Sequence, residues 1–358
     1  MRALCRIAAA RDANQAPGAG FNGAMTPSPR AADADRFILH RDPHPARVAS
    51  FAEDVRAGLG TRPFGLSPKY FYDDLGSALF EAITRLPEYY LTRIERDLLA
   101  TYGAEIAAAL GAPLELVELG SGSATKTRLL IDAVLARQPS LTFRPIDISA
   151  DALVESALAL VGAYEPLRVV AYASDYFSLL REKRMRTDDR ALALFLGSNI
   201  GNFEPQDADA LLRLLAGSLR RGDGLLIGYD LKKDASILEP AYDDALGVTA
   251  AFNKNLLARM NRELGADFDL GAFRFRARWN DERGAVESFL ISERAQRVCI
   301  AGCDLVVDFD AGDAIHTESS YKFTRDELVA LAGRCRFGEL RTYTDAASRY
   351  ALTLFTLA

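Results

Sequence analysis

The stretch VELGSGSATKTRLLIDA, residues 117–133, reads as a buried strand, a glycine turn and a helix. Gly120 and Gly122 allow the backbone to turn sharply and a ligand to approach closely, and the following helix presents free N–H groups. Many nucleotide-binding folds share this arrangement, and a tight turn without any ligand can also produce it. The stretch therefore predicts an α/β sheet with a candidate nucleotide site, and the flanking sequence has to identify the nucleotide.

Acidic residues end the next two predicted strands, Asp147 in FRPIDIS and Asp175 in ASDY. A carboxylate after the second strand can accept hydrogen bonds from both ribose hydroxyls, and one after the third can accept a hydrogen bond from an adenine amino group. This layout resembles that of class I methyltransferases, which bind S-adenosylmethionine. A nucleotide-dependent oxidoreductase would also carry the second-strand acid, but it normally has a fuller GxGxxG loop, which is missing here.

Outside this segment, predicted strands alternate with helices of about a dozen residues, which is typical of a parallel, doubly wound sheet. The first residues are rich in Ala, Gly, Pro and Asn without periodicity, as in disordered segments. We expect a disordered leader over residues 1–45, a helical segment over 46–98, a Rossmann-like S-adenosylmethionine-binding domain over 99–230, a smaller inserted α+β substrate lobe over 231–320, and completion of the sheet over 321–358.

The composition of the 358 residues is that of an ordinary globular protein, with 49% hydrophobic and 26% charged residues. The net charge of −6 and the absence of a basic block argue against nucleic-acid binding. No apolar run reaches the roughly 18 residues of a membrane span, and arginines interrupt any signal-like start, so we expect a cytoplasmic protein without a membrane partner. The four cysteines form no CxxC pair and the three histidines are scattered, so no metal site is predicted.

Several further motifs accompany the glycine turn in a fixed order: PKYFYDDLGSALFEAIT, LPEYYLTRIE, VELGSGSATKTR, GSNIGNF, AYDDALGVTAAFN and TESSYKF. In these motifs the chain resembles the histidine Nα-methyltransferase family, which forms hercynine, the trimethylated histidine of the ergothioneine route. The resemblance covers about residues 55–358. It implies a monomeric enzyme that uses S-adenosylmethionine to add up to three methyl groups to the α-amine of L-histidine.

The resemblance also assigns the cofactor-binding residues. It places Gly120 and Lys126 at the methionine end, Asp147 at the ribose, and Asp175 with Tyr176 at the adenine. Taken alone, Lys126 would more often be a solvated helix residue, whereas the two aspartates were already indicated by their positions at strand ends.

For the substrate, the resemblance implies a pocket of aromatic and polar groups, with Tyr72 as the key catalytic residue beside the amine. It places Tyr89 next to the amine with Phe80 nearby, Asn202 and Tyr242 on the carboxylate, Gly197 in the pocket wall, and Glu318 and Ser320 on the two imidazole nitrogens. Neutral donors at the carboxylate would add no positive charge beside the sulfonium. An aromatic stripe that includes Phe80 and Tyr89 is otherwise more often part of a hydrophobic core.

Two positions depart from the family pattern. Ser288 stands in VESFLIS where the histidine enzymes typically have a methionine against the substrate ring, and Asn199 stands where a threonine is common. A serine leaves the pocket larger or wetter. The alternative is therefore an N-methyltransferase of the same fold that acts on another amino acid, such as a tryptophan derivative or a modified histidine.

Overall fold

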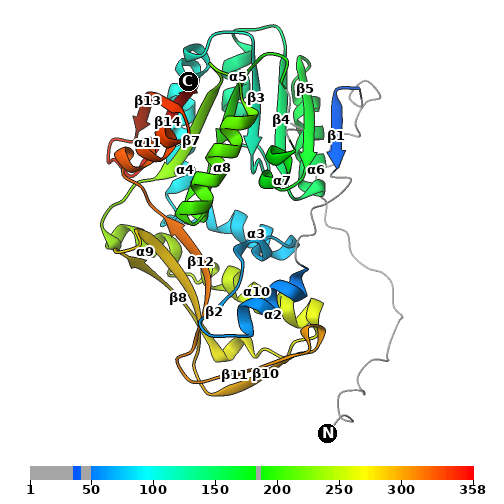
Figure 1. The fold of residues 1–358 in the computed structure, drawn as a ribbon, viewed down its shortest axis with the longest axis vertical. Coiled ribbons are helices and arrows are strands. Elements are labelled where there is room, and N and C mark those ends of the chain that lie inside the picture. Colours follow the sequence, from blue (N-terminus) through cyan, green and yellow to red (C-terminus); the bar gives the residue numbers. More distant parts are fainter. Residues whose placement is uncertain (1–34, 42–49, 183–186) are drawn as a thin grey trace.

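The computed structural model describes residues 35–41, 50–182 and 187–358, which form two lobes (Figure 1). The larger lobe contains an eight-stranded sheet in the order β1-β5-β4-β3-β6-β7-β14-β13. Only β14 runs antiparallel to its neighbours. The strands are β1 (Phe37–Arg41), β3 (Leu114–Leu119), β4 (Leu141–Asp147), β5 (Leu167–Ala173), β6 (Arg190–Phe195), β7 (Gly224–Asp230), β13 (Phe337–Thr344) and β14 (Tyr350–Leu357).

Helices cover both faces of this sheet, because its central strands are apolar on both sides. One face packs against α4 (Leu91–Ala109), α5 (Arg128–Leu135) and α6 (Ala150–Ala163). The other packs against α7 (Tyr176–Arg181), α8 (Pro205–Ser218) and α11 (Arg325–Arg334). The predicted fold class, a doubly wound α/β sheet of the class I methyltransferase type, is confirmed.

The smaller lobe is built around a four-stranded sheet in the order β2-β12-β9-β8. Its strands are β2 (Phe64–Gly65), β8 (Phe273–Asn280), β9 (Ala285–Ser292) and β12 (Ala314–Tyr321), and a separate hairpin is formed by β10 (Gln296–Ile300) and β11 (Leu305–Phe309). Its helices are α2 (Phe51–Leu59), α3 (Asp74–Ile83), α9 (Ala235–Tyr242) and α10 (Val248–Leu264), with short 3-10 turns η1 (Pro68–Phe71), η3 (Leu270–Ala272) and η4 (Ala301–Cys303). Two distant parts of the chain therefore supply this lobe.

One part of the predicted leader is ordered. Residues 1–34 and 42–45 lie outside the described residues, but Phe37–Arg41 forms β1, parallel to β5. Without β1, the outer edge of β5 would leave backbone N–H and C=O groups unpaired. The Arg36 guanidinium fixes this strand by donating to the carbonyls of Val161 and Tyr164 at 2.7 Å each. The prediction of disorder through residue 45 was wrong for this strand, because its stability comes from the partner edge rather than from its own sequence.

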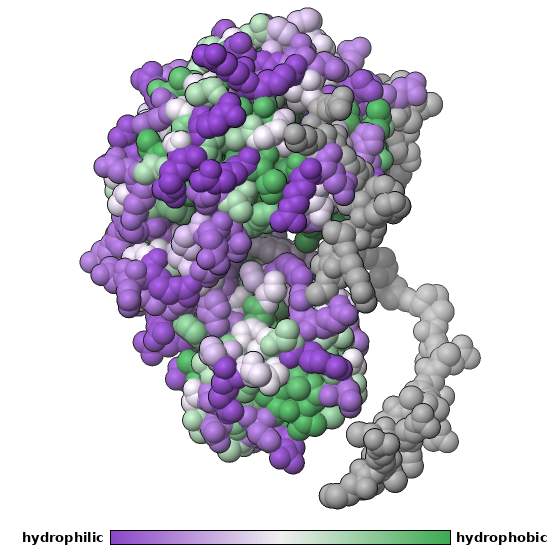
Figure 2. Space-filling model, in the orientation of Figure 1, coloured by the Kyte–Doolittle hydropathy of each residue, from purple (hydrophilic) through white to green (hydrophobic). Residues whose placement is uncertain are grey.

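The two lobes meet where η2 (Asn199–Asn202), which follows β6, packs against β12. Gly201 makes this approach possible, since a Cβ at that position would lie 2.5 Å from the carbonyl oxygen of Tyr321. The surface is hollowed between the lobes (Figure 2). The motifs GSNIGNF and TESSYKF, which are far apart in the sequence, thereby become neighbours.

Candidate active site

The strand order of the large sheet reverses between β3 and β6. From β3 the chain first adds β4 and β5 on one side, and it then adds β6 and β7 on the other side. In open α/β sheets, ligands bind beyond the carboxyl ends of the strands at such a switch point. Gly120 follows β3 and Gly197 follows β6, so both glycine turns lie there. We use the term cofactor edge for the ends of β3, β4 and β6, the loops that follow them, and the side chains that fix those loops.

Gly120 allows two side chains to lie close to the backbone. Its φ is +72°, a conformation that favours glycine, and a Cβ there would lie 2.4 Å from Tyr176 Oη and 3.1 Å from Asn199 Nδ2. The structure thus brings together Gly120 and Tyr176, two residues predicted for the cofactor, and adds Asn199 to the same place.

The two predicted aspartates have different surroundings. Asp147, at the end of β4, accepts hydrogen bonds from the backbone N–H of Gly122 at 3.2 Å and of Ser149 at 3.0 Å. These bonds fix its carboxylate beside the glycine turn. Asp175 caps helix α7, because its Oδ1 accepts a hydrogen bond from the Ser178 N–H at 2.9 Å. Asp175 therefore has a local structural task besides the cofactor role predicted for it.

Glu95 is a residue of the cofactor edge that the sequence reasoning missed. Its side chain is fully buried on α4 and forms an ion pair with Lys126. Its Oε1 also accepts hydrogen bonds from the Gly197 N–H and the Tyr350 hydroxyl, both at 2.7 Å. One carboxylate therefore ties together the loops that follow β3 and β6, and it explains why Lys126 is held in place. The signal in the sequence was a glutamate within the apolar stripe of α4, beside Ile94.

A second buried carboxylate links the two segments on either side of the glycine turn. Both oxygens of Glu118, in β3, lie 2.8 Å from the Thr127 hydroxyl. Burial raises the pKa of Glu118 to about 8, although the Thr127 hydrogen bond acts in the opposite direction. Glu118 thus connects the end of the strand to the start of α5, on either side of the glycine turn.

The hollow between the lobes, here the acceptor cleft, contains most of the residues predicted for the substrate. Its lining includes Tyr72, Phe80, Tyr89, Gly197, Asn202, Tyr242, Glu318 and Ser320, together with Ile83, Ser198, Asn199, Ala241, Thr249 and Phe252. Ser288 is absent from this lining. It is 2% exposed and is paired directly with Glu318 between β9 and β12, so the two side chains lie side by side on the same face of the sheet.

The aromatic residues of the cleft form a chain of edge-to-face contacts. Ring centroids are 5.6 Å apart for Tyr72 and Phe80, 6.3 Å for Phe80 and Tyr89, and 6.2 Å for Tyr89 and Tyr242. Phe252 stands 5.7 Å from Tyr72. Such contacts fix ring orientations, so the hydroxyls of the three tyrosines have defined positions along one wall.

The hydroxyl of Tyr72 stays protonated at neutral pH. Burial raises its pKa well above the ordinary value, and the negative charge of Glu318 raises it further. The residue as a whole is 46% exposed, and it lines the open acceptor cleft. The pKa values of Tyr89 and Tyr242 are also raised well above the ordinary value, mainly by burial. The cleft therefore offers neutral phenols.

Glu318 is the acidic group of the acceptor cleft. Burial raises its pKa to about 7, and the positive charge of Lys322 limits this increase. Ser320, two positions later on the same face of β12, forms a 3.0 Å hydrogen bond with the Tyr242 hydroxyl. The predicted imidazole ligand Ser320 and the predicted carboxylate ligand Tyr242 are thus in direct contact.

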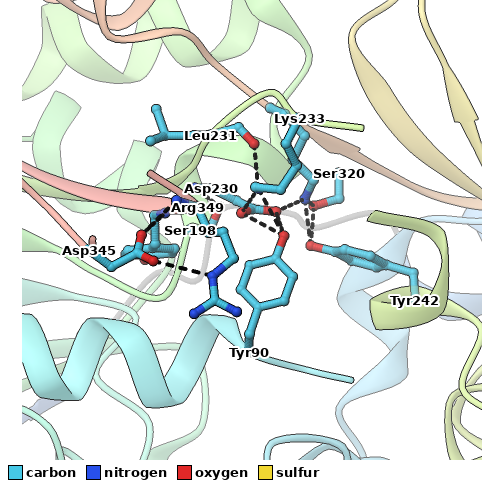
Figure 3. Close-up of polar contacts among 11 residues, drawn as sticks. Tyr90, Ser198, Asp230, Leu231, Lys233, Tyr242, Ser320, Asp345 and Arg349 are labelled. Atoms are coloured by element: carbon cyan, nitrogen blue, oxygen red, sulfur yellow. Dashed lines mark hydrogen bonds and ion pairs between the residues drawn. The ribbon is translucent and has the colours of Figure 1, made fainter. Parts of the chain in front are cut away.

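Behind this pair lies a buried charged cluster that the sequence reasoning also missed. Lys322 donates to the Tyr242 hydroxyl at 2.6 Å and to Ser320 at 2.9 Å, and it lies 3.2 Å from Asp230. Figure 3 shows Tyr242 and Ser320 on one side of Asp230, with Tyr90 and Lys233 reaching the same carboxylate. The neutral donors of the cleft therefore have a cation directly behind them.

Among the described residues, no helix combines the length and apolar character of a membrane span. Within the same residues, no group of three or more His, Cys, Asp or Glu side chains is arranged to hold a metal ion.

Comparison with known proteins identifies the family. Residues 51–357 match the family model described as histidine-specific, SAM-dependent methyltransferase. The chain is 46% identical to a histidine N-alpha-methyltransferase of Mycolicibacterium smegmatis and 45% identical to that of Mycobacterium tuberculosis, in both cases over 84% of this chain and 93% of the relative. It is 29% identical to ergothioneine biosynthesis protein 1 of Schizosaccharomyces pombe, over 80% of this chain and 38% of that protein. This chain belongs to the family of histidine-specific, S-adenosylmethionine-dependent methyltransferases.

Proposed function

We propose that the protein transfers methyl groups from S-adenosylmethionine to the α-amine of L-histidine, up to three times, and so forms hercynine for ergothioneine biosynthesis. Membership of the family and the named relatives support this proposal. We further propose that the enzyme acts on the free amino acid in the cytoplasm as a monomer.

The observation that carries the proposal is the wall shared by the cofactor edge and the acceptor cleft. Gly197, Ser198 and Asn199 line the cleft, and the Asn199 amide lies close to Gly120. A group held at Gly120 is therefore separated from the cleft by a single loop. This arrangement suits transfer of a small group between two ligands, because it holds both reactants in one orientation.

The residues of the cofactor edge fit S-adenosylmethionine. The open space at Gly122 admits a ligand close to the backbone, and two backbone bonds fix the Asp147 carboxylate, which is proposed to accept hydrogen bonds from the ribose. Lys126 and Gly197 are fixed by Glu95 at the methionine end. When bound there, S-adenosylmethionine supplies the activated methyl group.

Tyr72 is proposed to prepare the acceptor nitrogen. An amine is a nucleophile only when it is uncharged, and a neutral phenol can accept a hydrogen bond from its N–H while the lone pair remains free. The raised pKa of Tyr72 keeps this phenol neutral. Tyr72 therefore orients the amine rather than acting as a phenolate base.

Repeated methylation requires a pocket that tolerates a growing cation. The linked rings of Tyr72, Phe80 and Tyr89 present aromatic surface to the cleft. Each ring face can stabilise a nearby cation by roughly 0.5–2 kcal/mol. The same residues that orient the first amine can therefore retain the dimethylated intermediate for the last transfer.

Recognition of the acceptor side chain is assigned to Glu318 and Ser320. An imidazole ring offers one N–H donor and one acceptor nitrogen, which match a carboxylate and a hydroxyl. An apolar side chain would leave both groups without a partner in a partly buried site, and this is an effective way to reject it. Ser288, beside Glu318 on the neighbouring strand, is the position where another side chain could change this preference.

The test is direct incubation of the full chain with S-adenosylmethionine and single amino acids, followed by mass spectrometry. L-histidine should gain one, two and then three methyl groups, whereas L-tryptophan and a ring-methylated histidine should react more slowly. Faster methylation of tryptophan or of the modified histidine would overturn histidine as the acceptor. Absence of binding to S-adenosylhomocysteine in calorimetry would overturn the cofactor assignment.

A further inference from the structure

Lys322 is a buried lysine with all of its hydrogen bonds accounted for. Its side chain is fully buried, and an ammonium group has three donors and no acceptor. The three neighbouring oxygens belong to Tyr242 at 2.6 Å, Ser320 at 2.9 Å and Asp230 at 3.2 Å. Burial lowers the pKa of Lys322, whereas the charge of Asp230 and its hydrogen bond raise it. Three oxygen acceptors match a protonated lysine that holds two cleft hydroxyls.

These bonds determine what the two hydroxyls can offer to a ligand. Tyr242 and Ser320 each accept a hydrogen bond from Lys322, and the two hydroxyls also bond each other at 3.0 Å. One of their two protons is used in that mutual bond, whichever residue donates it. The remaining O–H is free to point into the cleft. Because Lys322 donates to both oxygens, the mutual bond can give way when the acceptor binds, so that Tyr242 donates to the carboxylate and Ser320 to the ring.

The charges of the cluster favour an anionic partner. Asp230 is shared by two buried lysines, with Lys233 at 2.6 Å and Lys322 at 3.2 Å, so these three residues carry one surplus positive charge. Tyr90 also donates to Asp230, at 3.0 Å, and adds no charge. Glu318 is the other acidic group near Lys322, and burial raises its pKa to about 7. A ligand carboxylate at Tyr242 would balance the surplus charge.

We propose that Lys322 is a positioning residue that, through the Tyr242–Ser320 pair, makes the cleft selective for acceptors with a free α-carboxylate. This inference rests on the proposed function and assigns to the known cleft a cation that does not touch the substrate. It replaces the expectation of purely neutral donors at the carboxylate. The Lys322 charge is separated from the ligand by one hydroxyl group. It can therefore attract the carboxylate without lying next to the sulfonium.

The test compares L-histidine with L-histidinamide, which lacks the negative charge but keeps the amine and the ring. Affinities are measured by calorimetry with S-adenosylhomocysteine bound, and kcat and KM by methylation assays. A hydrogen bond to a charged group typically changes binding about 10- to 100-fold, so Lys322→Met should weaken histidine binding by about that factor. Histidinamide binding should change less than about threefold, so that the preference for the carboxylate disappears.

A matched control is Lys233→Met, which removes the other lysine on Asp230. Lys233 contacts Tyr90 and the Leu231 carbonyl but neither cleft hydroxyl. Its loss removes the surplus charge but leaves both hydroxyls held, so it should lower the ratio of histidine to histidinamide affinity clearly less than Lys322→Met does. Equal losses for both ligands in Lys322→Met, with intact affinity for S-adenosylhomocysteine, would overturn the proposal.

A second variant keeps the proposal testable if Lys322→Met does not fold. Tyr242→Phe removes the hydroxyl that Lys322 contacts and leaves the lysine in place, and it should also reduce the preference for histidine over histidinamide. An unchanged preference would contradict the inference. Failure of the proposed function would look different, because the unmodified protein would then not methylate histidine at all.

Discussion

The cofactor edge and the acceptor cleft are held in place by different kinds of groups. At the cofactor edge, backbone groups and the buried carboxylate of Glu95 fix two glycine loops. In the acceptor cleft, side-chain hydroxyls on separate elements are oriented by buried charges, as with Tyr242 and Lys322. The first region depends on local chain geometry and the second on the packing of two lobes. Substitutions in each region should therefore affect one ligand and spare the other.

Tyr72→Phe should show the largest difference between its effect on histidine turnover and its effect on S-adenosylhomocysteine binding. Loss of a hydroxyl that orients the acceptor nitrogen should lower kcat for histidine by about 100-fold or more, the usual range for such groups. Affinity for S-adenosylhomocysteine should stay within about twofold, because a deletion at the cleft leaves the cofactor edge intact. Steady-state kinetics and calorimetry measure the two effects.

The matched control for that variant is Tyr70→Phe. The Tyr70 hydroxyl donates to Asp54 at 2.7 Å, and Tyr70 is not among the residues that line the cleft. Its removal should leave kcat within about threefold, as expected for a hydrogen bond outside the site. A comparable loss in both variants would show that the local fold, and not the Tyr72 hydroxyl, limits turnover.

Glu95→Gln tests the cofactor edge. Glu95 is fully buried and partners Lys126, the Gly197 N–H and the Tyr350 hydroxyl, so a neutral amide leaves the lysine unpaired. We expect the free energy of unfolding to fall by about 2–4 kcal/mol, somewhat below the usual cost of breaking a buried pair because Lys126 is partly solvated. The affinity for S-adenosylhomocysteine should fall more than that for histidine.

Glu105→Gln, on the same helix, is the control for Glu95. Glu105 pairs with Arg341 at 2.5 Å, and both side chains are more than one third exposed. Such surface pairs contribute about 0–1 kcal/mol, so chemical denaturation should detect little change. Equal destabilisation by both substitutions would contradict the special position assigned to Glu95.

The sequence predicted the cofactor edge better than the acceptor cleft for a physical reason. Gly120 and Lys126 belong to one short segment, and Asp147 ends the next strand, so strand–turn–helix geometry alone brings them together. The cleft depends on β12 meeting η2 and α9, and no local pattern in the residues specifies that meeting. Its residues were known in advance only through the family resemblance.

The charged supports escaped prediction because their partners are distant in sequence. Asp230 ends an apolar strand and Lys322 follows a hydroxyl-rich one, and each alone reads as an ordinary residue at a strand end. Their roles appear only when β7 and β12 are side by side. The strand Phe37–Arg41 was missed for a similar reason, since its partner is the edge of β5.

Glu318→Gln should change the pH dependence of stability and the binding of histidine, without changing the binding of S-adenosylhomocysteine. Burial raises the Glu318 pKa from 4.5 to about 7, so between these values the unfolded chain has lost a proton that the folded protein retains. This raised pKa makes the folded state progressively less stable as the pH rises from about 4.5 to 7. The glutamine variant lacks this penalty, and its stability relative to the unmodified protein should therefore increase by about 3 kcal/mol over that range.

Chemical denaturation at pH 4.5, 6 and 8 measures this difference, which should level off above pH 7. At pH 8 the same variant should bind histidine about tenfold more weakly, because a carboxylate accepts a stronger hydrogen bond from the ring than an amide does. Binding of S-adenosylhomocysteine should not change. A constant stability difference across the pH range would mean that the Glu318 carboxyl titrates normally in the folded protein.

The smallest effect is expected from Ser288→Met, which changes the side chain next to Glu318 on the neighbouring strand. Ser288 is buried and faces Glu318 across the β9–β12 pair, so a longer apolar side chain would extend along Glu318 toward the ring of the acceptor. The added contact, equivalent to one or two buried methylene groups, should lower the histidine KM by about three- to tenfold. Ser288→Ala, which removes the hydroxyl without adding bulk, should leave KM within about twofold. Ser288→Met could instead raise KM for histidine and lower it for a smaller amino acid. That result would mean that the space beside Glu318 is already filled and that the methionine side chain blocks part of the cleft.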